Sequence, residues 1–119
     1  MRTAEISIGG KTCLIVMNNR VLSRMEESGL SLEHIGEGKK VTNIMNLLAY
    51  MIEAGSRYAA REGLGEYPAL TLEELLDLTD TEDYAAIQEA IAACVAGDRT
   101  VDSIPPKKAE AAPAQAPGA

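Results

Sequence analysis

The first sixteen residues alternate between apolar and polar side chains in the manner of two short strands. Residues 3–8 read TAEISI, in which every second residue is apolar, and residues 11–16 read KTCLIV. A period of two is typical of a half-buried strand. Gly9-Gly10 lies between the two segments and tolerates the positive φ of a tight turn. We therefore expect an N-terminal β-hairpin, whose apolar face must pack on helices or pair with another chain because an isolated hairpin is marginal in water.

After residue 16 the spacing of the apolar residues changes to about 3.6, the period of an α-helix. The spacing predicts helices over residues 18–28, 40–62 and 82–96, and a shorter helix that begins after Thr71. Thr71 and Glu74 match a capping box, in which the hydroxyl and the carboxylate each accept a hydrogen bond from the other residue's amide. The predicted fold is α+β, with the hairpin packed on a bundle of about four helices.

Each predicted helix carries an apolar stripe that we expect to be buried. Gly55 lies on the longest stripe, where it costs about 1 kcal/mol relative to Ala. We expect this glycine to allow a close contact with another backbone. The stripes consist of Val21, Leu22 and Met25 in the first helix; Val41, Ile44, Met45, Leu48, Met51, Ile52, Tyr58 and Ala59 in the second; Leu72, Leu75 and Leu76 in the third; and Tyr84, Ile87, Ile91, Cys94 and Val95 in the last.

The composition changes after residue 97. Residues 98–119 contain four of the five prolines and six alanines, but a single isoleucine. Such a segment cannot bury enough apolar surface to offset the entropy of ordering, so we expect it to be disordered. The predicted organisation is an α+β domain over residues 1–97, followed by a disordered Ala/Pro-rich tail over residues 98–119.

The charge of the chain argues against nucleic-acid and membrane partners. Lys and Arg number 11 against 18 Asp and Glu, and the formal net charge is −7. Nucleic-acid binding draws on a basic surface, and anionic lipids repel an acidic one. The sequence has no signal peptide at its start and no run of 18 apolar residues, so we expect a cytosolic protein. For Cys13 and Cys94 we favour two buried thiols over a disulfide.

The residues that could perform chemistry are not spaced for it. The one histidine, His34, lies in a glycine-rich turn, and neither Cys13 nor Cys94 has a second histidine to activate it. No phosphate-binding GxxxxGK[ST] motif is present. An acidic cluster lacks the pattern of a calcium loop and fits the N-termini of two helices better. We therefore expect no catalysis, cofactor or metal. The cluster consists of Glu73, Glu74, Asp77, Asp80, Glu82 and Asp83.

The function that remains is binding to other proteins, through the edge of the hairpin or through an apolar groove between helices. Methionines could make such a surface adaptable, although we favour the interpretation that they replace the missing phenylalanines in the core. Tyrosines suit an interface or a boundary position equally. The candidate partner-binding residues are Met45, Met51, Tyr58, Tyr67 and Tyr84.

Several segments, in their order along the chain, resemble tail assembly chaperones of siphophages and of prophages of Gram-positive bacteria. They are TAEISIGGKT at residues 3–12, RVLSRMEE at residues 20–27, GLSL at residues 29–32, the long apolar helix, and LTLEELLD at residues 70–77. The likeness covers residues 3–97. It departs after the second strand, where the family often has aromatic residues and this chain has Met17-Asn18-Asn19.

The resemblance implies a non-enzymatic protein in the cytoplasm of the bacterial host that coats the tape measure protein, engages tail tube subunits and is absent from the mature virion. It also implies a longer product made by ribosomal frameshifting, which an A-rich slippery heptamer encoding Pro106-Lys107-Lys108 would permit. The chaperone hypothesis further includes an oligomer through hairpin edges. The alternative is a small acidic regulatory protein, of the antitoxin or anti-repressor type, that neutralises one protein target. A tail tube gene upstream and a very long helical gene downstream favour the chaperone, whereas a toxin gene favours the alternative.

Overall fold

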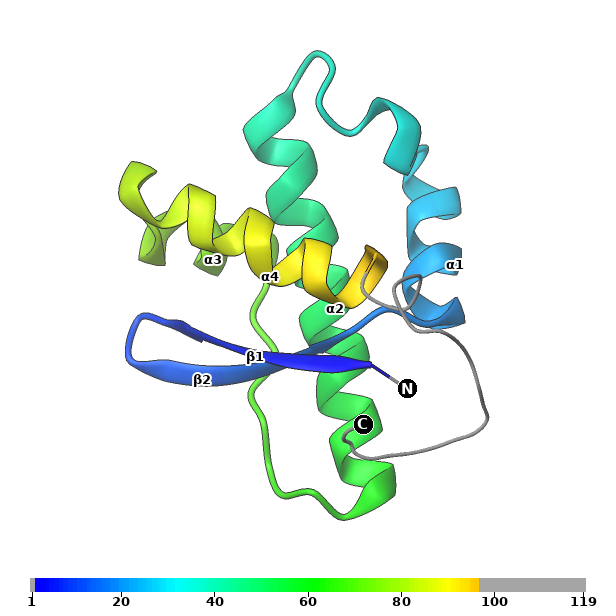
Figure 1. The fold of residues 1–119 in the computed structure, drawn as a ribbon, viewed down its shortest axis with the longest axis vertical. Helices are drawn as coiled ribbons and strands as arrows, with labels where there is room; N and C mark the ends of the chain where they lie inside the picture. The colour runs from blue at the N-terminus through cyan, green and yellow to red at the C-terminus, as the bar shows by residue number, and fades with distance from the viewer. Residues whose placement is uncertain (1, 97–119) are drawn as a thin grey trace.

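Residues 2–96 are the part of the chain that the computed structural model describes, and they fold as an α+β domain (Figure 1). The predicted hairpin and the four predicted helices are confirmed. The predicted disordered tail, residues 98–119, lies outside the described residues. The elements are β1 (Thr3–Ile8), β2 (Lys11–Val16), α1 (Asn19–Ser28), the 3-10 turn η1 (Leu32–His34), α2 (Lys40–Glu62), α3 (Leu72–Leu78), the 3-10 turn η2 (Thr81–Asp83) and α4 (Tyr84–Ala96).

Most of the burial in the hairpin is on its second strand, although Ile8 at the end of the first strand is also buried. β1 and β2 are antiparallel, with Ile8 opposite Lys11 beside the turn. Gly9 and Gly10 form this turn with φ of 58° and 81°. Side chains along β1 alternate between exposed and partly buried, whereas residues 13–16 of β2 are all buried. This difference arises because β2 lies between β1 and α2, and α4 packs along β1.

α2 is the central helix, which the hairpin, α4 and α1 surround (Figure 1). Its contact with β2 is made at Gly55, where a Cβ atom would overlap the carbonyl oxygen of Leu14 and lie 3.1 Å from the amide nitrogen of Ile15. The glycine therefore permits the direct helix-to-strand contact expected from the sequence. Gly55 is itself buried, between the buried side chains Ala54 and Ala59.

An ion-pair cluster joins α1 to α2. Arg24 on α1 donates two hydrogen bonds to the Glu53 carboxylate on α2, from Nε at 3.2 Å and from Nη2 at 3.0 Å. Arg57 lies 3.7 Å from the same carboxylate. The hydrogen bond from Arg24, with the nearby positive charges of Arg24, Arg57 and Arg20, lowers the pKa of Glu53 below its ordinary value of 4.5, against a smaller opposing effect of burial.

We expect this pKa shift to appear in the acid stability of the protein. A carboxylate whose pKa is lower in the folded than in the unfolded state stabilises the fold fully above pH 4.5, and that contribution is lost as the pH falls through the folded pKa. Glu53→Gln should therefore lose less unfolding free energy than the wild type between pH 4.5 and pH 3, measured by urea denaturation. Part of the dependence remains, because the Thr71 amide also lowers the pKa of Glu74.

The matched control is Glu62→Gln, which removes one carboxylate from the exposed end of the same helix. It should retain the pH dependence of the wild type. An identical acid response of Glu53→Gln and the wild type would contradict a stabilising role for the contact between Arg24 and Glu53.

The chain between α2 and α4 contains two capping boxes. Thr71 and Glu74 form the predicted capping box at the start of α3. Asp80 and Asp83 form a second one, and this capping box begins η2 rather than the predicted helix of residues 82–96. As a result α4 starts at Tyr84, two residues later than expected. Both cysteines are free and buried, as predicted, and the Cys94 thiol donates to the carbonyl oxygen of Ile15 at 3.6 Å.

The buried stripes agree with the sequence except at three positions. Leu22, Val41 and Leu76 were expected in the core, but their side chains are 44%, 52% and 39% exposed. The expectation was wrong because each of them lies at the border of its stripe, where no neighbouring element among residues 2–96 covers it. Val41 and Leu76 matter for function, because they lie together in the site described next.

Candidate functional site

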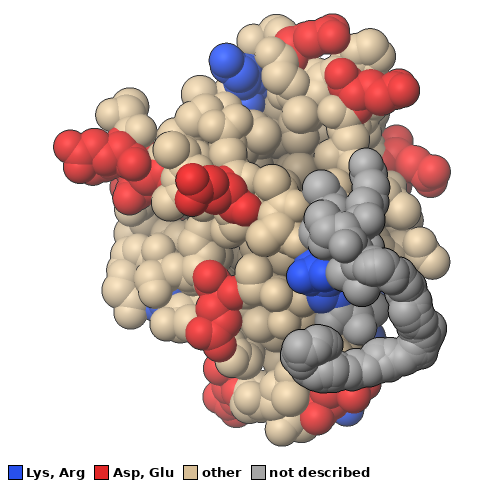
Figure 2. Space-filling model, viewed as in Figure 1, with Lys and Arg blue, Asp and Glu red and all other residues tan. Residues whose placement is uncertain are grey.

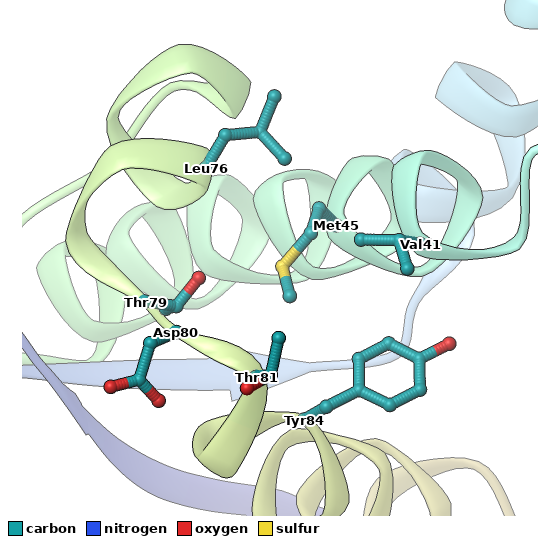
Figure 3. A pocket seen from close by; sticks show the side chains of 7 residues that line it. All are labelled: Val41, Met45, Leu76, Thr79, Asp80, Thr81 and Tyr84. Carbon is teal, nitrogen blue, oxygen red and sulfur yellow. The ribbon is translucent and has the colours of Figure 1, made fainter.

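An apolar groove of about 280 Å³ opens between the start of α2, the end of α3 and the start of α4 (Figure 3). Leu76 projects from α3 toward Val41 and Met45 on α2, and the ring of Tyr84 forms the opposite wall. The groove is lined by Val41, Met45, Leu76, Thr79, Asp80, Thr81 and Tyr84. We refer to these seven residues as the apolar groove.

Helical spacing places the apolar side chains. Val41 and Met45 are four residues apart, so they lie on the same face of α2, one turn from each other. Met45 is 3% exposed and forms the floor, whereas Val41 and Leu76 remain largely open to solvent. The groove therefore combines a buried base with two exposed apolar walls.

The polar wall of the groove is held by short-range hydrogen bonds. The Thr79 hydroxyl donates to the Leu75 carbonyl oxygen at 2.7 Å. The Asp80 amide donates to the Asp83 carboxylate at 2.9 Å, and the Asp80 carboxylate accepts from the Glu82 amide at 2.8 Å. These bonds fix the connection between α3 and α4, so the shape of this wall is largely preformed.

Tyr84 carries an unpaired hydroxyl in the groove wall. Its oxygen is buried and has no hydrogen-bond partner among residues 2–96. Figure 3 shows the hydroxyl pointing toward the end of the groove where Val41 lies. A buried hydroxyl without a partner costs about 1–3 kcal/mol. Because this oxygen is closed to solvent, a group in the groove can bond it only if the Tyr84 side chain rotates, and such a bond would recover that cost.

The groove separates an acidic edge from a basic one. Four exposed carboxylates, Asp77, Asp80, Glu82 and Asp83, occur in the seven residues from 77 to 83, which contain no Lys or Arg. Among the described residues no ion pair neutralises them. On the other side, Lys39 and Lys40 immediately precede Val41. Figure 2 shows acidic groups at the left, toward the connection of α3 and α4, and a basic group near the start of α2. We call residues 77–83 the acidic edge.

The five candidate partner-binding residues fall in different places. Met45 and Tyr84 both line the apolar groove, which brings together residues that are far apart in the sequence. Met51 is fully buried in the core and does not line the groove, so its part in partner binding stays a prediction. Tyr58 is partly buried against the core. Tyr67 lies elsewhere, and its hydroxyl donates to the Glu5 carboxylate at 2.8 Å.

Val41 and Leu76 are the apolar residues of the groove that the sequence analysis missed, and it did not single out Thr79 or Thr81 either. Val41 and Leu76 were assigned to the core because they continue an apolar stripe. The available signal was their position: Val41 is in the first turn of its helix and Leu76 is near the end of a helix of seven residues. Apolar residues at helix ends reach beyond the neighbouring elements, but the sequence does not show which ends meet.

His34 and Cys13 lie outside the apolar groove. His34 is exposed and lies 3.0 Å from the Glu37 carboxylate. Burial raises the pKa of the Cys13 thiol, which favours the less reactive protonated form. Within residues 2–96 no group of three or more His, Cys, Asp or Glu side chains is arranged to hold a metal ion. No helix in this part of the chain has the length and hydropathy needed to cross a bilayer.

Two further depressions are lined mainly by small and polar residues. One lies at the end of α2 beside Tyr67, and the other between Asn18 and Arg61. Neither contains the exposed leucine and valine side chains of the apolar groove. The apolar groove is therefore the strongest candidate for a binding site.

Comparison of the chain with models of protein families, with curated proteins and with solved structures finds no match.

Proposed function

We propose that the protein is a phage tail assembly chaperone, which binds the tape measure protein and tail tube subunits in the cytoplasm of the bacterial host without catalysing a reaction. The observation that carries the proposal is the apolar groove, which leaves Val41 and Leu76 exposed on a strongly acidic domain. A holding protein needs an apolar surface for its client and enough charge to stay soluble when that surface is exposed.

The order of the elements along the chain is a second observation that supports this function. The hairpin, the long central helix and the capped α3 coincide with the segments that resemble the chaperones. In this two-stranded sheet the outer edge of each strand pairs with no other strand in residues 2–96. Such an edge offers a route to an oligomer through the hairpin.

The test is co-expression of the full chain with a candidate tape measure protein. We expect the tape measure protein to become soluble and to co-purify with the chain. Val41→Asp, which places a charge in the groove, should reduce the soluble fraction at least about tenfold, because a buried charge without a partner is costly at an apolar contact.

Leu64→Asp is the matched control. Leu64 is 53% exposed, against 52% for Val41, and follows the opposite end of α2. The control adds the same charge next to the far end of the helix, about 32 Å from Val41 over the 21 residues to Glu62 at a rise of 1.5 Å per residue, and should leave solubilisation unchanged. A tape measure protein that stays insoluble with the wild-type chain, in several constructs, would refute the proposed function.

A further inference from the structure

We infer that the apolar groove recognises a segment in which one or two apolar side chains are next to a lysine or arginine, oriented so that the basic group lies at the acidic edge. This inference rests on the proposed function and specifies the part of the client that is held. It is carried by the charge complementarity of the groove, by its size, and by the unpaired hydroxyl of Tyr84.

The size of the groove limits the apolar part of the segment. A volume of about 280 Å³ lies just below the range of small-molecule sites, so it suits one or two side chains rather than a whole helix face. The buried Met45 floor and the open Val41 and Leu76 walls provide the contact. Methionine can repack around side chains of different shapes, which suits a client that offers many similar segments.

The charges on the two sides of the groove determine the orientation. Carboxylates at the acidic edge attract Lys or Arg and repel Asp or Glu, whereas Lys39 and Lys40 have the opposite effect at the Val41 end. A segment with its basic group at the acidic edge is therefore favoured over the reverse orientation. Asp80 contributes most directly, because it is the carboxylate that lines the groove itself.

The Tyr84 hydroxyl provides a polar contact inside the groove. If the Tyr84 side chain rotates toward the bound segment, a backbone carbonyl of that segment can accept a hydrogen bond from this oxygen, which is closed to solvent and unpaired within residues 2–96. Tyr84→Phe removes the hydroxyl and retains the ring. This change should keep or raise the melting temperature of the free chain, and it should weaken binding about fivefold, the value of one ordinary hydrogen bond.

The experiment measures binding of fluorescein-labelled peptides to the full-length chain by anisotropy. The probe contains two leucines four residues apart, followed by two lysines. A second peptide replaces the lysines with glutamates, and a third replaces the leucines with serines. We expect both replacements to weaken binding at least about tenfold, because the first introduces like-charge repulsion and the second removes the apolar contact.

Variants of the chain show where on the chain the peptide binds. Val41→Asp should weaken binding of the lysine peptide at least about tenfold, and Leu64→Asp should not change it. Asp80→Asn keeps a side-chain oxygen for the Glu82 amide but removes the charge, and it should weaken binding about threefold. Glu62→Gln, a charge removal at the far end of α2, is its control.

Several outcomes would overturn the inference. Equal binding of the lysine and glutamate peptides would refute the charge preference, and full binding by Val41→Asp would refute the groove. A concentration-dependent dimer of the chain that Val41→Asp abolishes would show that a second copy occupies the groove instead. Full affinity in Tyr84→Phe would refute the contact with the hydroxyl.

The two proposals fail separately. If co-expression solubilises the tape measure protein and Val41→Asp has no effect on it, the proposed function stands and the groove inference fails. If the peptides bind in the expected order but no tape measure protein is solubilised, the groove inference stands and the role in tail assembly fails.

Discussion

Replacing Gly55 with alanine is expected to destabilise the protein by about 3 kcal/mol or more, which is at the upper end of the usual cost of inserting a group into a packed core. A Gly-to-Ala change inside a helix ordinarily stabilises it by about 0.5–1 kcal/mol. The sign reverses here because the new methyl group would overlap the carbonyl oxygen of Leu14. The obstacle is strand backbone rather than the flexible end of a side chain, so α2 and β2 would have to separate.

The size of this effect is large compared with the whole stability of such a domain, which is about 5–15 kcal/mol. Thermal and urea denaturation followed by circular dichroism would measure it. Gly36→Ala is the matched control, because a Cβ at this exposed loop position meets nothing within 4 Å. It should change the unfolding free energy by less than about 0.5 kcal/mol. Equal stability of Gly55→Ala and the wild type would contradict the direct packing of α2 on β2.

The contact at Gly55 illustrates how much of this fold can be predicted from the sequence. Local rules were sufficient for the hairpin, because its alternation and its Gly-Gly turn are contained in residues 3–16. They were also sufficient for the capping box of Thr71 and Glu74. A glycine on an apolar stripe indicated a close backbone contact, but the partner, Leu14, is 41 residues away in the chain (55 minus 14) and no local pattern identifies it.

The apolar groove was harder to predict for the same physical reason. Hydrophobic periodicity shows which face of a helix is apolar, but it does not show where a neighbouring helix stops covering that face. Met45 and Tyr84 were selected as adaptable or amphipathic residues, and the tertiary fold brings them together. Met51 was selected on the same grounds, yet it lies six residues further along α2, where its side chain is fully buried.

The acidic segment shows a related limit of sequence reasoning. The sequence analysis assigned its carboxylates to helix N-termini, and the structure places Glu74, Asp80 and Asp83 in capping boxes. Capping, however, involves only some of these carboxylates. Asp77 and Glu82 accept no hydrogen bond among those found within residues 2–96, and they remain exposed beside the groove. The same stretch can therefore cap a helix and also present a negatively charged surface. Composition alone does not show which carboxylates have which role.

Leu75→Ala is the second change for which we expect a large effect, a loss of about 2–5 kcal/mol from the cavity it creates. Leu75 is fully buried, and it is the buried residue of α3. Isolated helices shorter than about 12–15 residues are marginal in water, so this seven-residue helix depends on the packing of Leu75 against the core. Denaturation in urea, read by circular dichroism, would measure the loss.

The adjacent residue provides the control that separates stability from binding. Leu76→Ala removes the same atoms from a side chain that is 39% exposed and lines the groove. It should cost at most about 1 kcal/mol of stability and still weaken binding of the leucine-lysine peptide, because the client contact is lost while α3 stays in place. Leu75→Ala should lower both the stability and the affinity for the peptide, because α3 carries a wall of the groove and would no longer be held against the core. If Leu76→Ala proved as destabilising as Leu75→Ala, its side chain would belong to the core, and the groove would lose one of its two exposed apolar walls.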